Sequence, residues 1–202
     1  MFKLKILGLS CSARKNGNTV NALRVALNHL ESKNIETNLI HLTDYDIRPC
    51  KNCNMECYHN KDCPTPDESK KLADLLEEFD ALIVGSPLYN GTIPALLSAF
   101  LERNPYPYDE VLKSKITSAI IVGSIGEAQA ALILTSWLAP GKHFVGWIEL
   151  DPRSTAARNT RLKDSWLEGN MLEDEQNRKR VKELADRVHS KMVEQKMANV
   201  EQ

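Results

Sequence analysis

The sequence predicts an α/β fold in which a doubly wound, five-stranded parallel sheet lies between two layers of helices. Short runs of apolar, often β-branched residues alternate with longer segments whose apolar residues recur every three or four positions, as is typical of a three-layer fold. The chain has 202 residues, 42% of them hydrophobic and 26% charged, which is the balance of a globular protein. We therefore expect one domain over residues 1–202 with a sizeable buried core.

The first two strands are expected at residues 3–9 and 37–42, where apolar residues cluster in short runs. Between these strands, apolar residues at spacings of three and four predict a helix. Its buried face would consist of Val20, Leu23, Leu27 and Leu30.

A third strand is expected at residues 81–85 (ALIVG), because a short continuous apolar run is typical of a strand buried on both faces. A loop over about residues 43–66 precedes it, followed by a helix with Asp67 as its N-cap. Another helix follows the strand and ends before Pro105 and Pro107. The apolar faces of these two helices would contain Leu72, Leu75, Leu76 and Phe79, and Leu96, Leu97, Phe100 and Leu101.

The fourth and fifth strands are expected at residues 116–122 (ITSAIIV) and 144–150 (FVGWIEL). Residues 151–169 show a weak, polar pattern, which indicates a loop or a short helix. The helix between the two strands and the last helix of the chain are marked by Ala128, Ala131, Leu132, Thr135 and Leu138, and by Val181, Leu184, Val188 and Met192.

Five strands separated by helices, in a chain of this size, indicate a flavodoxin-like sheet, although periodicity alone allows other doubly wound strand orders. In such sheets, ligands bind beyond the carboxyl ends of the strands. We therefore expect the functional residues in the loops that follow the strands.

Charge and hydropathy narrow the classes of function. Twenty-six basic and twenty-seven acidic residues give a net charge of -1, without the basic surplus typical of a nucleic-acid-binding protein. No apolar run approaches the roughly 20 residues that cross a bilayer, and residues 1–10 do not resemble a signal peptide. These features predict a cytoplasmic protein that binds neither nucleic acid nor membranes.

The loop after the first strand has the composition of a phosphate-binding loop. It leads directly into a helix, and the N–H groups and dipole at a helix N-terminus favour a bound phosphate. The GxxxxGK[ST] and GxGxxG patterns are absent, which argues against a P-loop hydrolase and the usual dinucleotide site. A plain polar loop with Asn18 as N-cap is the alternative. The candidate phosphate residues are Ser10, Ser12, Arg14, Asn16, Gly17, Asn18 and Thr19.

This loop, SARKNGNT (12–19), resembles the FMN-phosphate loop of the NADPH-dependent FMN reductase and iron–sulfur flavoprotein family. A second segment, GSPLYNGTIPALLSAFLER (85–103), resembles the loop with which this family holds the flavin ring. The similarity covers residues 3–150 and implies a flavodoxin-like fold that binds FMN. For the ring it implies the loop residues Ser86, Pro87, Leu88, Tyr89, Asn90 and Gly91.

An ordinary turn, signalled by proline and by Asn-Gly, is the alternative for the second segment. A third flavin loop is expected after the fourth strand, at GSIGEAQ (123–129), with Ser124 and Gly126 as candidate contacts. Related proteins often carry more glycines there, so this sequence departs from the family pattern.

Four of the five cysteines have the spacing C-x2-C-x3-C-x5-C between positions 50 and 63. Such a set can hold a [4Fe–4S] cluster or tetrahedral zinc, and unligated or redox-active thiols are the third alternative. Iron–sulfur flavoproteins carry a compact cysteine motif at this position, although usually with one residue fewer between the second and third cysteines. The resemblance therefore favours a cluster bound by Cys50, Cys53, Cys57 and Cys63, whereas Cys11 is expected to be a small packed residue.

Together these features predict an FMN-dependent electron-transfer flavoprotein with a [4Fe–4S] cluster. No catalytic acid or base is assigned, because flavin chemistry takes place on the ring itself. The resemblance implies NAD(P)H or a ferredoxin-like protein as redox partner and a homodimer or homotetramer. An NAD(P)H-dependent FMN or quinone reductase with a structural or zinc-bound cysteine loop, and a non-enzymatic redox sensor, are the alternatives.

Overall fold

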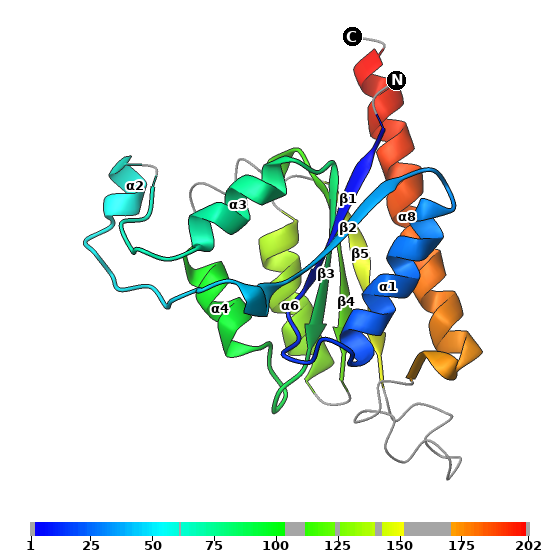
Figure 1. The fold of residues 1–202 in the computed structure, drawn as a ribbon, viewed down its shortest axis with the longest axis horizontal. Helices are drawn as coiled ribbons and strands as arrows, with labels where there is room; N and C mark the ends of the chain where they lie inside the picture. The colour runs from blue at the N-terminus through cyan, green and yellow to red at the C-terminus, as the bar shows by residue number, and fades with distance from the viewer. Residues whose placement is uncertain are drawn as a thin grey trace.

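The computed structural model describes residues 3–60, 62–103, 112–123, 126–139, 143–151 and 171–200. At its centre lies a parallel sheet in the order β2-β1-β3-β4-β5, which confirms the flavodoxin-like fold (Figure 1). The strands are β1 (Lys5–Ser10), β2 (Glu36–His41), β3 (Ala81–Pro87), β4 (Ile116–Val122) and β5 (Phe144–Leu150).

Two layers of helices enclose the sheet. Helices α1 and α8 cover one face, and α3, α4 and α6 cover the other (Figure 1). The helices of these layers are α1 (Asn18–Glu31), α3 (Ser69–Glu77), α4 (Ala95–Glu102), α6 (Glu127–Leu138) and α8 (Glu175–Val200). Shorter helical segments are η1 (Leu42–Asp44), α2 (Glu56–Asn60) and η3 (Met171–Glu173).

The alternation of side chains along the strands creates two cores. Ile6 and Ile83 point to the core beneath α1 and α8, whereas Leu7 and Leu82 point to the core beneath α3, α4 and α6. Every residue of β3 and β4 is buried, as expected of central strands covered on both faces.

The strand boundaries agree closely with those predicted. Strands β4 and β5 cover the predicted residues, and β1 and β2 differ from the prediction by one or two residues at their ends. Strand β3 continues past the predicted end at residue 85, because Ser86 and Pro87 still lie in register with Ile121 and Val122 of β4.

Two other local predictions concern the start of α3 and the segment after β5. The N-cap position of α3 is Glu68, not Asp67, although Asp67 Oδ1 accepts a hydrogen bond from the N–H of Ser69 (3.0 Å). The segment predicted as a loop or short helix at residues 151–169 lies, apart from its first residue, outside the described residues.

A polar cluster joins α1 to α8. Asp186 Oδ1 lies 2.8 Å from both His29 Nε2 and Lys33 Nζ. Burial, and secondarily the positive charge of Lys33, lowers the pKa of the neighbouring His189. As the pH falls below about 6.5, the unfolded chain protonates this histidine before the folded protein does, and folding stability decreases.

We therefore expect the urea midpoint to fall between pH 7 and pH 5.5, and to fall less in a His189→Gln variant. The control is His59→Gln, because His59 is exposed on α2. Equal pH dependence in all three proteins would contradict a contribution from His189.

Candidate cofactor site and cysteine loop

The loops singled out from the sequence meet at the carboxyl ends of the strands, the lower edge of the sheet in Figure 1. Backbone hydrogen bonds fix where they start: the N–H of Cys11 donates to the carbonyl of Gly85 (2.8 Å), and the N–H of Leu88 donates to the carbonyl of Val122 (2.9 Å). The loops after β1, β3 and β4 therefore lie next to one another, where ligands bind in doubly wound sheets.

The first loop is shaped by its own hydroxyl groups. Ser10 Oγ accepts a hydrogen bond from the N–H of Ser12 (3.4 Å), and Ser12 Oγ accepts one from the N–H of Arg14 (3.1 Å). Both serines are buried, whereas residues 13–16 are exposed. In this conformation, the serines hold the loop and the exposed tip presents its basic side chains.

Helix α1 begins at the end of this loop, with Gly17 as its N-cap and no side-chain capping bond. The first N–H groups of a helix have no intrahelical partner, so this end can receive an anion. Asn18 has a further role, because its Oδ1 accepts a hydrogen bond from the N–H of Met171 (2.9 Å). It thereby joins the loop to η3, and Thr19 beside it is buried.

Two basic residues missed at the sequence level also hold this loop. Arg24, on the next turns of α1, donates to Asn16 Oδ1 (3.4 Å) and to the carbonyl of Lys15 (3.3 Å). Lys15 in turn forms an ion pair with Asp44 of η1. The sequence signal for these two residues was a cluster of basic residues in the loop and the following helix. Nothing in the sequence indicated that Lys15 pairs with Asp44.

The second loop is a tight hairpin turn. Tyr89 and Thr92 exchange backbone hydrogen bonds of 2.9 and 3.2 Å. Asn90 and Gly91 between them have φ values of 51° and 80°, the left-handed pair that Asn-Gly favours in such turns. Ser86 and Pro87 are buried at the end of β3, whereas Tyr89 and Asn90 face solvent.

A hydrogen bond and a close backbone approach join the three loops. Tyr89 Oη accepts a hydrogen bond from the N–H of Ala13 (3.3 Å), linking the second loop to the first. Gly126, with φ +88°, lies so close to Gly91 that a Cβ added to it would be 2.1 Å from the Gly91 carbonyl oxygen. The third loop therefore packs directly on the second. Ser124, the other residue predicted in the third loop, lies outside the described residues.

The cysteine loop leaves the sheet after η1, and α2 stands apart from the rest of the molecule (Figure 1). All five cysteines are free thiols. Cys11 is buried in the core, and burial raises the pKa of its thiol, in line with the packed residue expected from the sequence. Within the described ranges, no three His, Cys, Asp or Glu side chains are gathered closely enough to hold a metal ion.

The donor set of the loop nevertheless has the chemistry of an iron–sulfur or zinc site: four thiols within fourteen residues. One of these thiols, that of Cys63, already has a hydrogen-bond donor: Arg103 Nη2 donates to Cys63 Sγ (3.1 Å). Burial acts to raise the pKa of Cys63, but hydrogen bonds from Thr65 and Arg103 lower the pKa below its ordinary value and favour the thiolate that metals bind.

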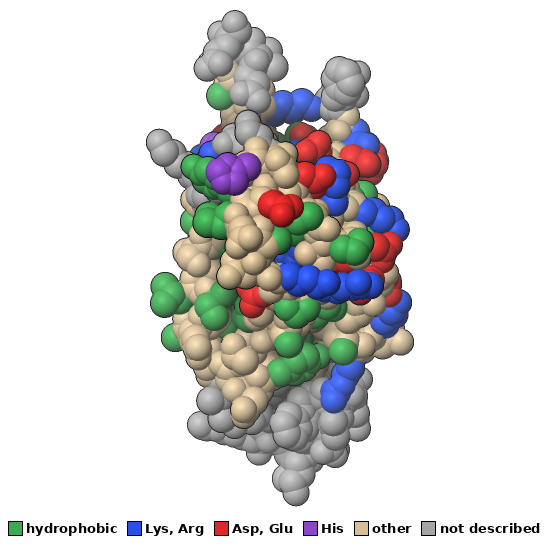
Figure 2. Space-filling model, turned by 90° about the vertical axis from the view of Figure 1, so that its left-hand side faces the viewer, with side chains coloured by type: hydrophobic (Ala, Val, Ile, Leu, Met, Phe, Trp, Pro, Cys, Tyr) green, Lys and Arg blue, Asp and Glu red, His purple; other side chains and the backbone are tan. Residues whose placement is uncertain are grey.

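Figure 2 shows the molecule from the side of the cysteine loop. Charged side chains gather on one half of this face, and hydrophobic and uncharged side chains occupy the other half. Among the helices on the outer layer beside this loop, α3 (SKKLADLLE) is rich in charge, whereas α4 (ALLSAFLE) and α6 (EAQAALILTSWL) are largely apolar.

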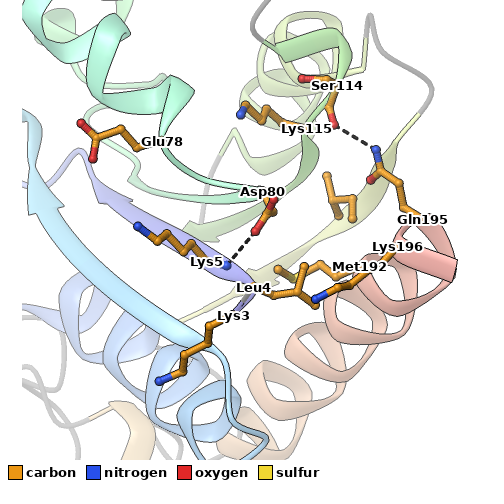
Figure 3. Close-up of a pocket in the computed structure, with 11 residues that line it drawn as sticks. Lys3, Leu4, Lys5, Glu78, Asp80, Ser114, Lys115, Met192, Gln195 and Lys196 are labelled. Atoms are coloured by element: carbon orange, nitrogen blue, oxygen red, sulfur yellow. Dashed lines mark hydrogen bonds between the residues drawn. The ribbon is translucent and has the colours of Figure 1, made fainter. Parts of the chain in front are cut away.

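A cavity of about 550 Å³ lies at the opposite end of the sheet (Figure 3). Its polar groups hold the fold together: Asp80 Oδ2 accepts the N–H of Lys5 (2.8 Å), and Lys115 Nζ donates to the carbonyl of Glu77 (2.8 Å), in the last turn of α3. The cavity faces the amino ends of the strands, away from the three loops, so we do not assign it to the cofactor.

Comparison with known proteins identifies the family. The family model for NADPH-dependent FMN reductase matches residues 4–148. The chain belongs to this family. The match includes the first and second loops, their junction at Tyr89 and Ala13, and the cysteine loop, and it ends within β5.

Iron–sulfur flavoproteins of archaea are similar in sequence. The chain is 36% identical over 122 residues to an iron–sulfur flavoprotein of Methanocaldococcus jannaschii, which is 60% of this chain and 63% of that protein. It is 30% identical over 152 residues to an iron–sulfur flavoprotein of Archaeoglobus fulgidus, covering 71% and 69% of the two chains. The match thus spans somewhat less than two thirds of the first relative's length.

Solved structures show the same fold. An azoreductase from Bacillus anthracis superimposes with a TM-score of 0.61 at 15% identity, covering 89% of this chain and 99% of that one. An NADH:FMN oxidoreductase in its apo form gives a TM-score of 0.59 at 19% identity, covering 95% of this chain and 90% of that one.

Within the described ranges, no helix combines the length and apolar character required to traverse a bilayer.

Proposed function

We propose that the protein is an FMN-dependent oxidoreductase that transfers electrons between FMN and a [4Fe–4S] cluster in its cysteine loop. The observation that carries the proposal is the junction of the three loops at the carboxyl ends of β1, β3 and β4. Tyr89 Oη and the Ala13 N–H join two of them, and the close approach of Gly126 to Gly91 joins the third.

In this proposal the first loop binds the phosphate of FMN. The first N–H groups of α1, which have no acceptor within the helix, would face the anion, and the exposed Arg14 would add positive charge. Arg24 and the buried serines keep the loop in shape. The phosphate-binding segment comprises Ser10, Ser12, Arg14, Asn16, Gly17, Asn18 and Thr19.

The second loop holds the ring of FMN, which when bound supplies both one-electron and two-electron transfer. The Asn90-Gly91 turn gives the loop a backbone path whose N–H groups can meet the polar edge of the ring. Tyr89 provides a partly exposed aromatic side chain beside it. The ring-binding residues are Ser86, Pro87, Leu88, Tyr89, Asn90 and Gly91, with Ser124 from the third loop.

Cys50, Cys53, Cys57 and Cys63 would hold the cluster. Two features support this assignment: relatives of the chain are named iron–sulfur flavoproteins, and Arg103 Nη2 donates a hydrogen bond to Cys63 Sγ, which helps to lower the pKa of that thiol. Of the remaining three cysteines, Cys57 lies in α2 and Cys53 shortly before it, whereas the N–H of Cys50 donates to Glu102 at the end of α4. These three would close around the metal during assembly.

For partners we propose NAD(P)H or a ferredoxin-like protein as electron donor, and a homodimer or homotetramer. The largely apolar sequences of α4 and α6 support association of the chain with further copies of itself. Leu132 of α6, for example, is 72% exposed, and a contact with another subunit would bury it.

The test is a Cys53→Ala/Cys57→Ala double variant, purified without oxygen beside the wild type. The wild type is expected to contain FMN and about four iron and four sulfide per chain, and the double variant to keep FMN and lose iron. A Lys51→Ala/Glu56→Ala control in the same loop should keep both, because these two side chains are exposed and are not thiols. Protein that lacks flavin and does not bind added FMN would overturn the proposal.

A second candidate is an NAD(P)H-dependent FMN or quinone reductase whose cysteine loop is structural or binds zinc. The observations in its favour are that the family model matching residues 4–148 is that of NADPH-dependent FMN reductase, and that four thiols also suit tetrahedral zinc. Zinc without sulfide in the purified protein, or FMN with neither metal, would favour this function.

A further inference from the structure

The cysteine loop is attached to the last turn of helix α4. Glu102 Oε2 accepts a hydrogen bond from the N–H of Cys50 (3.3 Å), and Arg103 Nη2 donates to Cys63 Sγ (3.1 Å). The first and fourth cysteines are thus held by neighbouring residues. Helix α4 itself begins at Ala95, shortly after the Asn90-Gly91 turn, so one helix connects the ring-binding loop to the cysteine loop.

The charge of Arg103 is buried together with that of Asp67. Their side chains are 2% and 1% exposed and form an ion pair through Arg103 Nη1, which also donates to the carbonyl of Arg48 (3.1 Å). A guanidinium that only neutralises a carboxylate usually makes two parallel bonds to it. Here the second terminal nitrogen contacts a sulfur instead, and Nε has no hydrogen-bond partner in the described structure.

A cation that donates to a thiolate has two effects on a metal centre. It fixes the position and orientation of that ligand, as groups behind metal ligands generally do. It also stabilises negative charge on the sulfur, and hydrogen bonds to sulfur are among the features that set the potential of an iron–sulfur cluster. Both effects require the nitrogen to reach the sulfur, which Arg103 does from a helix terminus.

We propose that Arg103 is a positioning residue of the cysteine centre, which fixes the Cys63 sulfur at the end of α4 as the point around which the other three cysteines close. The inference rests on the proposed function, because it assumes that these cysteines bind a cluster. It adds that the buried Asp67–Arg103 pair anchors this cluster to the helix that follows the ring-binding loop.

The test is Arg103→Lys, which keeps the positive charge but loses the fork that reaches three partners. The matched control is Arg48→Lys, because the Arg48 side chain lies in the same loop, is exposed and pairs with Asp46. Iron, sulfide and FMN are measured per chain after identical anaerobic reconstitution, and the cluster potential is measured by a redox titration followed by electron paramagnetic resonance.

Arg103→Lys is expected to keep FMN, to lose half or more of its iron and sulfide, and to shift the remaining cluster to a more negative potential. Arg48→Lys should match the wild type in its iron, sulfide and FMN content and in its cluster potential. If Arg103→Lys does not fold, an Asp67→Asn/Arg103→Gln variant replaces it, because neutralising both partners leaves no unpaired buried charge, and the same losses are expected.

The outcomes separate the two proposals. Wild-type iron, sulfide and potential in the folded Arg103 variant would overturn the role of Arg103 and leave the cluster assignment standing. A wild-type protein that binds FMN but neither iron nor sulfide would overturn the cluster assignment and, with it, this inference.

Discussion

Replacing Asp67 with alanine is expected to lower the free energy of unfolding by about 3–5 kcal/mol. Asp67 pairs with the buried Arg103, and its carboxylate also accepts hydrogen bonds from the N–H groups of Arg48 (2.8 Å) and Ser69 (3.0 Å). The substitution would leave a buried guanidinium without its counter-charge and two backbone donors without their acceptor. Each of these losses is destabilising.

The matched control is Asp74→Ala in the same region. Asp74 lies on α3 and pairs with Lys70 at 3.6 Å, but both side chains are at least 60% exposed. Exposed pairs of this kind contribute about 0–1 kcal/mol. Urea unfolding followed by circular dichroism measures both variants, and equal, small losses would show that the Asp67–Arg103 pair is not a buried structural interaction.

The sheet could be predicted from sequence because its signal is local. A run such as ITSAIIV carries its own burial pattern, and the predicted strands at residues 116–122 and 144–150 coincide with those in the structure. The positions of the candidate site loops could be predicted from the strands, because parallel strands place their carboxyl ends at one edge of the sheet. The five-residue helix α2 was not predicted, since it buries none of its residues and leaves no apolar period.

The contacts that hold the candidate site together depend on residues far apart in the chain. Arg103 lies 40 positions from Cys63, and Asn18 lies 153 positions from Met171. Neither pairing has a periodic or compositional signal, because each depends on how helices and loops far apart in the chain pack beside one another. The sequence therefore indicated which residues have the appropriate chemistry, whereas the structure identifies the side chains that hold them.

The contact between the second and third loops also joins residues far apart in the chain, and a substitution there is expected to have a large effect on FMN binding. Gly126→Ala is expected to weaken FMN binding at least about tenfold and to lower the free energy of unfolding by about 1–3 kcal/mol. Gly126 has φ +88°, which is unfavourable for alanine, and the new Cβ would lie 2.1 Å from the Gly91 carbonyl oxygen. The Asn90-Gly91 turn would have to move, and with it the proposed ring-binding loop.

A Gly146→Ala control separates backbone strain from the clash with the second loop. Gly146 of β5 also has a left-handed φ of +109°, but a Cβ added there meets no atom within 4 Å. This control should therefore lose stability through backbone strain alone and keep wild-type affinity for FMN, measured by fluorescence quenching of the free flavin. If both alanine variants bind FMN as the wild type does, the approach of Gly126 to Gly91 does not shape the flavin site. If both lose affinity equally, the effect comes from a general loss of stability, because only the Gly126 variant pushes on the second loop.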